Sequence, residues 1–457
     1  GARVTATNVD TNTNTNATTT ATGDYVIPGL QPGRYRLTVQ TPGFKAYIQD
    51  GITLQVQDRP AIDVTLEPGE VTTTVTVAAE TPLLETSTAS RGEVVSQREV
   101  ESMPMNGRNV FMLGTLTAGV TFTARGAGNS FIRTTSTDGM SSIAVSGGEP
   151  RNNEAVLDGI STQGANGTIQ FVPSVEATQE FKVQTNNFDA ELGRFTGGVV
   201  NATTKSGTNQ VHGVLYEFLR NSVLNARDTF AGSKPQFGYN LFGGSLGGPV
   251  YLPKLYDGRN RTFFFFNYEG SREGVPRSAN YSVPTLAQRK GDFSTTFVRL
   301  SNGQPQALTI YDPDTTRLVG NINMRDPFPG NVIPGNRINP VAANTMKFYP
   351  DPNVPGDPIT AANNWRMAYK DPVLDNGVVA RIDHRISDRH QIFGRYTWRY
   401  SFVGSNSANP MNVLLGTSNN RPSHGIAVDD TYTLNPTTVL NIRAGFSRLS
   451  QFNPSNS

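Results

Sequence analysis

The chain has 457 residues, enough for two to four domains, and its formal net charge is only +2. The absence of cysteine excludes disulfide scaffolds, cysteine-ligated zinc, iron–sulfur clusters and cysteine nucleophiles, and the balanced charge gives no reason to expect a nucleic-acid partner. With 45 glycines, 29 prolines and 17% charged residues, the composition favours an all-β protein. No run of about 18 apolar residues occurs, so only β-strands could cross a membrane.

Residues 1–68 are predicted to form a small β-sandwich. Apolar alternation at 25–27, 35–39, 52–56 and 62–66 indicates short strands, and Pro-Gly turns separate them. The strings Tyr-Val-Ile-Pro-Gly-Leu, Pro-Gly-Arg-Tyr-Arg-Leu-Thr-Val and Pro-Gly-Phe between positions 25 and 44 resemble the carboxypeptidase regulatory-like domain. That resemblance implies a prealbumin-like sandwich that acts as a structural spacer or, by fold analogy alone, as a carbohydrate-binding module.

Residues 69–92 are predicted to be a linker that contains one extended strand. Val71, Thr73, Val75 and Val77 alternate with threonines in a Thr/Val-rich run. Such a strand can add to the edge of a partner's sheet, where main-chain hydrogen bonds provide the affinity. It can equally be the last strand of the sandwich or a simple tether, and the residues leave these alternatives open.

Residues 93–205 are predicted to form a mixed α+β domain. Ser96 and Glu99 have capping-box spacing, so a short helix is expected to begin there and to end before Pro104. A tight turn is expected at 105–110, and a second one at Asp158-Gly159 within a strand region. Further strands are expected at 143–145, 155–160 and 180–184, and a β-branched strand is expected after Gly197-Gly198.

Residues 206–457 show the pattern of membrane β-strands. Between 391 and 402 one face carries Gln391, Arg395, Thr397, Arg399 and Ser401, the other face is apolar, and Phe393 is the exception. Similar alternation occurs at 378–386, 426–434, 440–446 and 262–269, with a short turn at 387–390. One polar and one apolar face suit a barrel whose lumen is wet. The alternative is a soluble sandwich or propeller with aromatic-rich strands.

Long polar stretches between these strands, above all 272–375, are expected to be extracellular loops. They are the expected ligand-capturing surface, or else a shield, and no residue in them identifies a ligand contact.

Enzyme motifs are not supported, so no catalytic residue, cofactor or metal is expected. Gly243 to Gly247 fit G-x-S-x-G literally, but Gly248-Pro249 follow where a nucleophile elbow needs a helix. The four histidines have no metal-site spacing, and no phosphate-binding loop exists.

Several strings resemble TonB-dependent outer-membrane receptors. Met-Pro-Met-Asn-Gly-Arg-Asn-Val at 103–110 is similar to the start of their plug domain, and Leu157-Asp-Gly to a turn within it. The segment 196–209 resembles the junction of plug and barrel. The strings at 212–221, 243–249 and 263–269 are similar to the Oar-like branch, in which a regulatory-like sandwich precedes the plug.

The resemblance implies a sandwich (1–68), a linker with a TonB-box-like strand at Val75, Thr76 and Val77 (69–92), a plug (93–205) and an antiparallel outer-membrane barrel (206–457). The box can also lie upstream of Gly1. The implied plug-signature residues are Asn106, Gly107, Arg108, Asp158 and Gly159.

We therefore expect a receptor in the outer membrane, with the sandwich and linker periplasmic, that imports a substrate by energy-coupled plug movement; carbohydrate and peptide are the candidate substrate classes. The implied partners are a TonB-like inner-membrane protein, outer-membrane lipid and an extracellular substrate of unknown identity, with no nucleic acid. The alternative is an adhesin or surface-interaction protein whose barrel is only an anchor. Since plugged transporters have about 22 strands, the chain is expected to be a fragment holding eight to ten of them.

Overall fold

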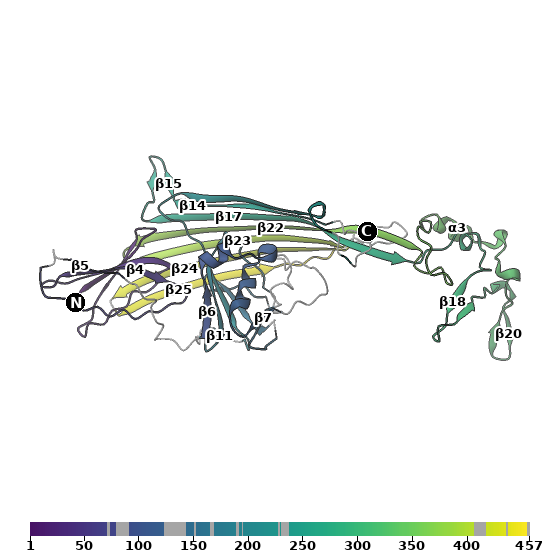
Figure 1. Ribbon diagram of the computed structural model, residues 1–457, viewed down its shortest axis with the longest axis horizontal. Coiled ribbons are helices and arrows are strands. Elements are labelled where there is room, and N and C mark those ends of the chain that lie inside the picture. Colours follow the sequence, from purple (N-terminus) through teal and green to yellow (C-terminus); the bar gives the residue numbers. More distant parts are fainter. Residues whose placement is uncertain are drawn as a thin grey trace.

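The computed structural model describes a mainly β molecule made of three units (Figure 1). In the described part of the chain, no helix is both long and apolar enough to cross a bilayer. The described residues are 1–70, 74–78, 91–122, 143–149, 152–164, 169–188, 192–193, 195–226, 229, 237–405, 417–435 and 437–454.

The N-terminal unit, called the sandwich here, contains one five-stranded sheet in the order β2-β1-β3-β4-β5. Alternate residues of β3 are buried, so Tyr35, Leu37 and Val39 join Val4 and Ile52 in the core. The strands are β1 (Arg3–Asn8), β2 (Asn14–Thr18), β3 (Gly33–Gln40), β4 (Ala46–Leu54) and β5 (Thr74–Ala78).

The prediction of strands at 25–27 and 62–66 is wrong. Both segments are extended and pack on the core without forming a ladder, and the Tyr25 hydroxyl donates a hydrogen bond to the Ile62 carbonyl at 2.7 Å. Pro28 directly follows the first segment and Pro60 lies two residues before the second, and proline lacks the N–H that a ladder needs. Apolar alternation therefore predicted burial correctly but not strand pairing.

The middle domain packs a second five-stranded sheet, in the order β10-β9-β12-β11-β6, against short helices. The predicted helix is confirmed as α1, with the Ser96–Glu99 capping box in place. Phe181 and Val183 of β11 lie at the centre of the core with Val100 of α1. The elements are β6 (Arg91–Val95), α1 (Gln97–Ser102), η1 (Asn106–Arg108), η2 (Val110–Leu116), β7 (Val120–Phe122), β8 (Ile143–Val145), β9 (Glu154–Leu157), β10 (Ile160–Ser161), β11 (Thr178–Asn186) and β12 (Val199–Thr204).

The third unit is a curved antiparallel sheet of seven long strands, the barrel sheet. In the described residues this is fewer than the eight to ten strands expected, because individual strands reach 23 residues rather than about 10. The first and last strands are not paired with each other in the described structure, so the barrel is open. The order is β13 (His212–Asn221), β14 (Gly238–Pro249), β17 (Thr262–Tyr281), β22 (Trp365–Ser387), β23 (His390–Ser405), β24 (Thr417–Asn435) and β25 (Thr438–Leu449).

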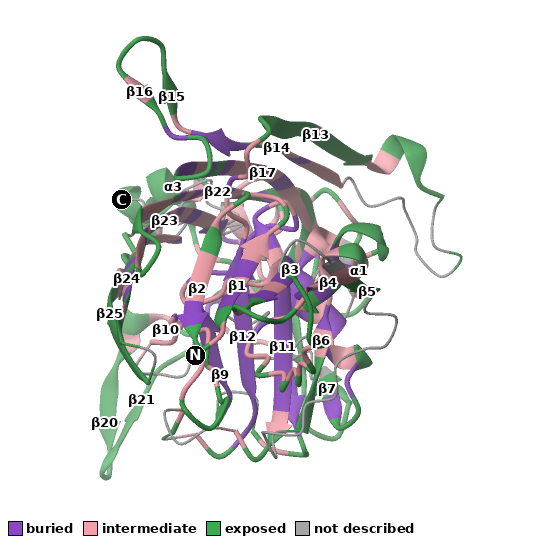
Figure 2. Cartoon of the chain, turned by 90° about the vertical axis from the view of Figure 1, so that its left-hand side faces the viewer, coloured by how far each residue is buried: buried purple, intermediate pink, exposed green. Residues whose placement is uncertain are grey.

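The polar face of the barrel sheet is its buried face. On β23 Phe393, Arg395, Thr397, Arg399 and Ser401 are buried and Gln391 is partly buried, whereas Tyr396 on the other face is 40% exposed. Figure 2 shows the barrel strands wrapped around the buried strands of the middle domain. The alternation predicted for this strand is therefore confirmed.

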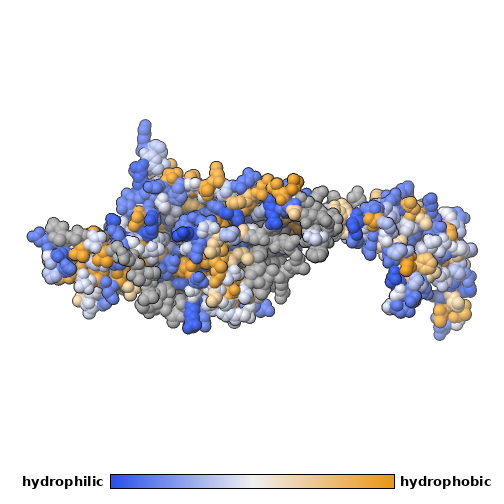
Figure 3. Space-filling model, in the orientation of Figure 1, coloured by the Kyte–Doolittle hydropathy of each residue, from blue (hydrophilic) through white to orange (hydrophobic). Residues whose placement is uncertain are grey.

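The predicted 272–375 loop is shorter than expected. β17 continues to Tyr281 and pairs there with Trp365 of β22, so only residues 282–364 leave the sheet, a segment called the excursion here. These strand extensions were not predicted because their sequence is polar and lacks alternation. Membrane-type alternation is no longer required outside the lipid. The excursion is folded, and Figures 1 and 3 show it at the opposite end of the strands from the sandwich. It holds η5 (Gln288–Lys290), β18 (Phe297–Arg299), β19 (Pro305–Ala307), η6 (Pro313–Thr315), β20 (Arg317–Val319), β21 (Ile322–Met324), η7 (Pro329–Asn331), η8 (Gly335–Arg337) and α3 (Pro340–Met346).

Candidate functional site

The predicted Asp158-Gly159 turn joins β9 to β10 and faces the barrel wall. Both residues have positive φ angles, 48° and 79°. Asp158 accepts hydrogen bonds from the backbone N–H and the hydroxyl of Thr204, each at 2.8 Å. These bonds fix the carboxylate at the end of β12, where the chain leaves the middle domain for the barrel.

Two arginines of the barrel sheet bind the Asp158 carboxylate. Arg381 of β22 donates to Oδ1 at 3.2 Å, and Arg395 of β23 donates to Oδ2 at 3.0 Å. All three side chains are no more than 2% exposed. We call this cluster the Asp158 latch; it links the middle domain to the barrel wall through fully desolvated charges.

Arg381 has further partners that hold it in place. Its guanidinium also pairs with Asp383 at 2.7 Å and lies 4.4 Å from the centroid of the Phe393 ring. Phe393, the exception in the predicted polar face, thus serves as a cation–π support for the latch.

Gly159 lies against a second barrel ion pair. A Cβ at this position would meet the guanidinium of Arg443, which pairs with Asp429 at 2.7 Å. Glycine is therefore required here both by the positive φ and by the close approach of the barrel.

The other predicted signature residues form a separate contact with the first barrel strand. Gly107 has a φ of 78° within η1, and Arg108 follows with a φ of 53°. Arg108 pairs with Glu176 and lies over the Phe218 ring of β13, 4.4 Å from its centroid. Asn106 lies in η1, but its side chain is outside the described structure. The structure thus places Asp158 with Gly159 and Arg108 at two separate contacts between the middle domain and the barrel, not at one site.

The TonB-box-like residues Val75, Thr76 and Val77 lie on β5. This strand pairs in parallel with β4 and is the last strand of the sandwich sheet. Its other side is not paired with any strand that the structure describes. Val71 and Thr73, the start of the predicted strand, lie outside the described residues.

No catalytic arrangement accompanies these contacts in the described residues. Ser245 of the literal G-x-S-x-G match lies in the middle of β14, not in a strand-to-helix turn. No cluster of three or more His, Cys, Asp or Glu side chains in the described part of the chain could hold a metal ion.

The model of the outer membrane beta barrel domain matches residues 203–457, more than half of the chain. The chain belongs to the outer-membrane β-barrel family. The N-terminal part of this barrel protein, residues 1–67, matches the carboxypeptidase regulatory-like domain. This family places the protein in the outer membrane.

A relative and two solved structures resemble this barrel protein. It is 26% identical over 270 residues to the TonB-dependent transporter Oar of Myxococcus xanthus, covering 55% of this chain and 24% of the relative. The outer membrane transporter YddB from Escherichia coli matches with a TM-score of 0.48 and 13% identity, over 80% of this chain and 40% of that one. The ferric enterobactin receptor mutant R480A of Pseudomonas aeruginosa, in complex with enterobactin, matches with a TM-score of 0.41 and 13% identity, over 80% and 42%.

The predicted resemblance to Oar-like TonB-dependent receptors is confirmed by the two domain matches and by the Oar relative. The chain spans about a quarter of the length of that relative.

Proposed function

We propose that this chain is part of a TonB-dependent outer-membrane receptor that imports a substrate by energy-coupled movement of the middle domain, which acts as the plug. The observation that carries the proposal is the Asp158 latch between that domain and the barrel wall. Breaking a buried ion pair by removing one partner costs roughly 3–5 kcal/mol. Spontaneous opening is therefore rare, and an external pull is needed to move the plug.

We place the pull on β5, where Val75, Thr76 and Val77 act as the TonB-box-like strand. The side of β5 that no described strand pairs with offers main-chain groups to a strand of a TonB-like inner-membrane protein. Parallel pairing with β4 makes the sandwich the first unit to receive the force.

The domains 1–68, 69–92, 93–205 and 206–457 then serve as sandwich, linker, plug and barrel. We place the sandwich in the periplasm because it lies beside the short turn at 387–390, and short turns of outer-membrane barrels are periplasmic. The excursion at the other end is then extracellular and is the first candidate for substrate capture. The chemistry of the substrate stays open, including the carbohydrate suggested by the sandwich fold.

The strand-addition role is tested with two double variants of the full-length receptor. Val75→Pro with Val77→Pro removes main-chain donors, whereas Val75→Ala with Val77→Ala keeps them. Binding to the purified periplasmic domain of the TonB-like protein should be lost in the first variant and kept in the second. Equal binding by the proline variant would place the box elsewhere in the protein.

Transport is tested without knowledge of the substrate. Deleting the receptor and deleting the TonB-like protein should cause growth defects on a shared set of nutrients. A receptor deletion that alters only surface adhesion, with growth unchanged on every nutrient, would instead support the adhesin alternative.

A further inference from the structure

The sandwich contacts the inner end of the barrel sheet through polar groups. The Asn16 side-chain amide donates to Asp388, in the turn between β22 and β23, at 3.1 Å. Arg385 donates to the Asn14 carbonyl nearby. At the junction of middle domain and barrel, the backbone N–H of Asn209 donates to the Asp10 carbonyl at 3.2 Å.

The turn at 28–32 of the sandwich packs against the barrel wall. The Gly29 carbonyl accepts a hydrogen bond from Gln391 of β23. A Cβ on Gly29 would lie 2.6 Å from the Gln391 amide and 2.8 Å from Thr431 of β24, and its φ of +71° also favours glycine. The turn therefore fits closely against the barrel wall only when position 29 is glycine.

The same turn reaches the Asp158 latch. Arg381 Nη2 donates to the Gln31 side-chain oxygen at 3.2 Å while Nη1 of the same guanidinium binds Asp158. The sandwich and the plug thus share one barrel side chain.

The plug supplies the third contact. The Glu180 carboxylate of β11 is buried and accepts a hydrogen bond from the backbone N–H of Val56 in the sandwich. The sandwich therefore touches the turn end of the barrel, the barrel wall and the plug.

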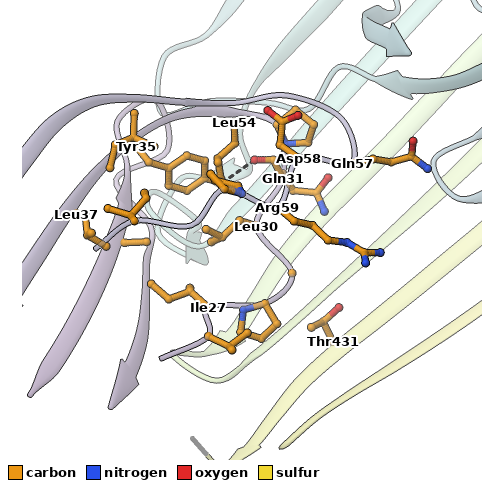
Figure 4. Close-up of a pocket in the computed structure, with 18 of the residues that line it drawn as sticks. Ile27, Leu30, Gln31, Tyr35, Leu37, Leu54, Gln57, Asp58, Arg59 and Thr431 are labelled. Carbon is orange, nitrogen blue, oxygen red and sulfur yellow. Dashed lines mark hydrogen bonds between the residues drawn. The ribbon is translucent and has the colours of Figure 1, made fainter. Parts of the chain in front are cut away.

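The surface between these units is hollow. A cavity of about 1170 Å³ lies over the apolar face of the sandwich sheet and reaches the middle domain, β24 and β25. The sandwich contributes apolar and polar side chains to its lining, and β24 and β25 contribute polar ones (Figure 4). Ile27, Leu30 and Leu37 mark the apolar side in that view, and Thr431 marks the barrel side. Permanent interfaces are apolar and packed as densely as protein cores, so this polar and hollow contact is of the separable kind.

We propose that the sandwich is a separable cap on the inner mouth of the barrel, which docks on the Asp388 turn, Gln391 and Glu180 and undocks as a folded unit. Val4, Leu37 and Val39 border the cavity but pack with Ile27 and Ile62 of the sandwich itself, so undocking does not require unfolding. Because Arg381 joins cap and latch, undocking removes one support of the plug. The docking surface stands on these contacts and does not depend on the proposed transport.

Cross-linking in the full-length protein tests the docked state, since residues 1–457 contain no cysteine that would interfere. Asn16→Cys with Asp388→Cys should react rapidly with a short bis-maleimide and shift the mobility of the denatured protein. The control pair is Thr76→Cys with Asp388→Cys. Thr76 lies at the opposite edge of the sandwich sheet, four strand spacings or about 19 Å from β2. Equal rates for the two pairs would overturn the proposal.

Two further changes test the surface and the separability. Gly29→Ala should slow cross-linking of the 16/388 pair about tenfold, because the added methyl group overlaps Gln391 and Thr431. Gly23→Ala is the matched control, since Gly23 also has positive φ (+94°) but nothing within 4 Å of its Cβ position. Gln391→Ala, which leaves the sandwich unchanged, should slow the reaction about threefold through the lost hydrogen bond.

The sandwich should stay protease-resistant in both slowed variants. Unchanged rates in both, or proteolysis of the sandwich in both, would refute the separable cap.

Discussion

Arg381 and Arg395 lie directly opposite each other on neighbouring strands, an arrangement that like charges disfavour. The Asp158 carboxylate lies between them and offsets this repulsion with one oxygen for each guanidinium. Arg381 also pairs with Asp383 of its own strand, and the middle domain thus supplies the anion that the two arginines share. Removing the Asp158 carboxylate therefore affects both the middle domain and the barrel sheet.

Replacing Asp158 by asparagine should destabilise the docked plug by about 3–5 kcal/mol, because two buried guanidinium groups lose their shared counter-charge. The measurement is the denaturant midpoint of the detergent-solubilised receptor. Asp326→Asn is the matched control, since that carboxylate pairs with Arg317 at the exposed surface of the excursion and should change the midpoint little. Equal shifts for the two variants would argue against a latch.

Glu180 makes stability depend on pH. Burial, the largest cause, and nearby Asp58 raise the pKa of Glu180 from 4.5 to about 7, while the Val56 N–H and Lys182 act in the opposite direction. The folded protein then binds the proton more tightly than the unfolded chain, so stability falls as pH rises from about 4.5 to about 7 and levels off above that.

The expected loss over that pH range is about 3 kcal/mol in the free energy of unfolding. Glu180→Gln should remove this part of the pH dependence, as measured by urea unfolding at pH 5 and pH 8. Identical pH slopes for wild type and variant would contradict the assignment.

Sequence patterns predicted single residues only in part. The positive-φ turn at Asp158-Gly159 could be predicted, because few residue pairs suit it, and alternation placed Arg381 and Arg395 on the lumen face. The pairing of these arginines with Asp158 could not be predicted, since they lie more than 220 residues from Asp158 in the sequence. One available signal was missed: both arginines lie at nearly equal distances from the turn at 387–390, which predicts that they face each other.

At the scale of elements, period-2 alternation predicted the strands of the barrel sheet reliably. It did not predict where those strands end. Strands β22 and β23 were predicted within the membrane pattern, but β22 extends to Trp365, where both faces meet water and alternation disappears. The capping box predicted α1 because its hydrogen bonds are local. The order of the middle sheet, in which β12 pairs with β9 in parallel, depends on distant contacts and had no local signal.

An arginine on the apolar face of a barrel strand should prevent stable insertion. Ile426→Arg on β24 places a charge in lipid at a cost of about 2–4 kcal/mol near the bilayer midplane. Ile322→Arg in the excursion is the matched control, because Ile322 is exposed in β21 but faces water. Folding yield into liposomes should fall for the first variant only. Equal yields would place β24 outside the membrane.

At the scale of the whole molecule, the excursion is separable from the barrel. Tyr281 and Trp365 are direct partners at the ends of β17 and β22, so a two-residue Asn-Gly turn can join the strands in place of 282–364. The shortened receptor should still assemble in the outer membrane, as judged by heat-dependent gel mobility. Loss of assembly would instead make the excursion part of the barrel's structural core.

The contacts between sandwich and barrel also set an order of folding. The hydrogen bond from Asn16 to Asp388 joins residues 372 positions apart, whereas the strands of the sandwich sheet pair with near neighbours in the chain. Chains generally fold their N-terminal domains first, and distant pairings form last because they close the longest loops. The sandwich can thus complete its own sheet before the distant contacts form, and it then attaches to the barrel as a folded unit.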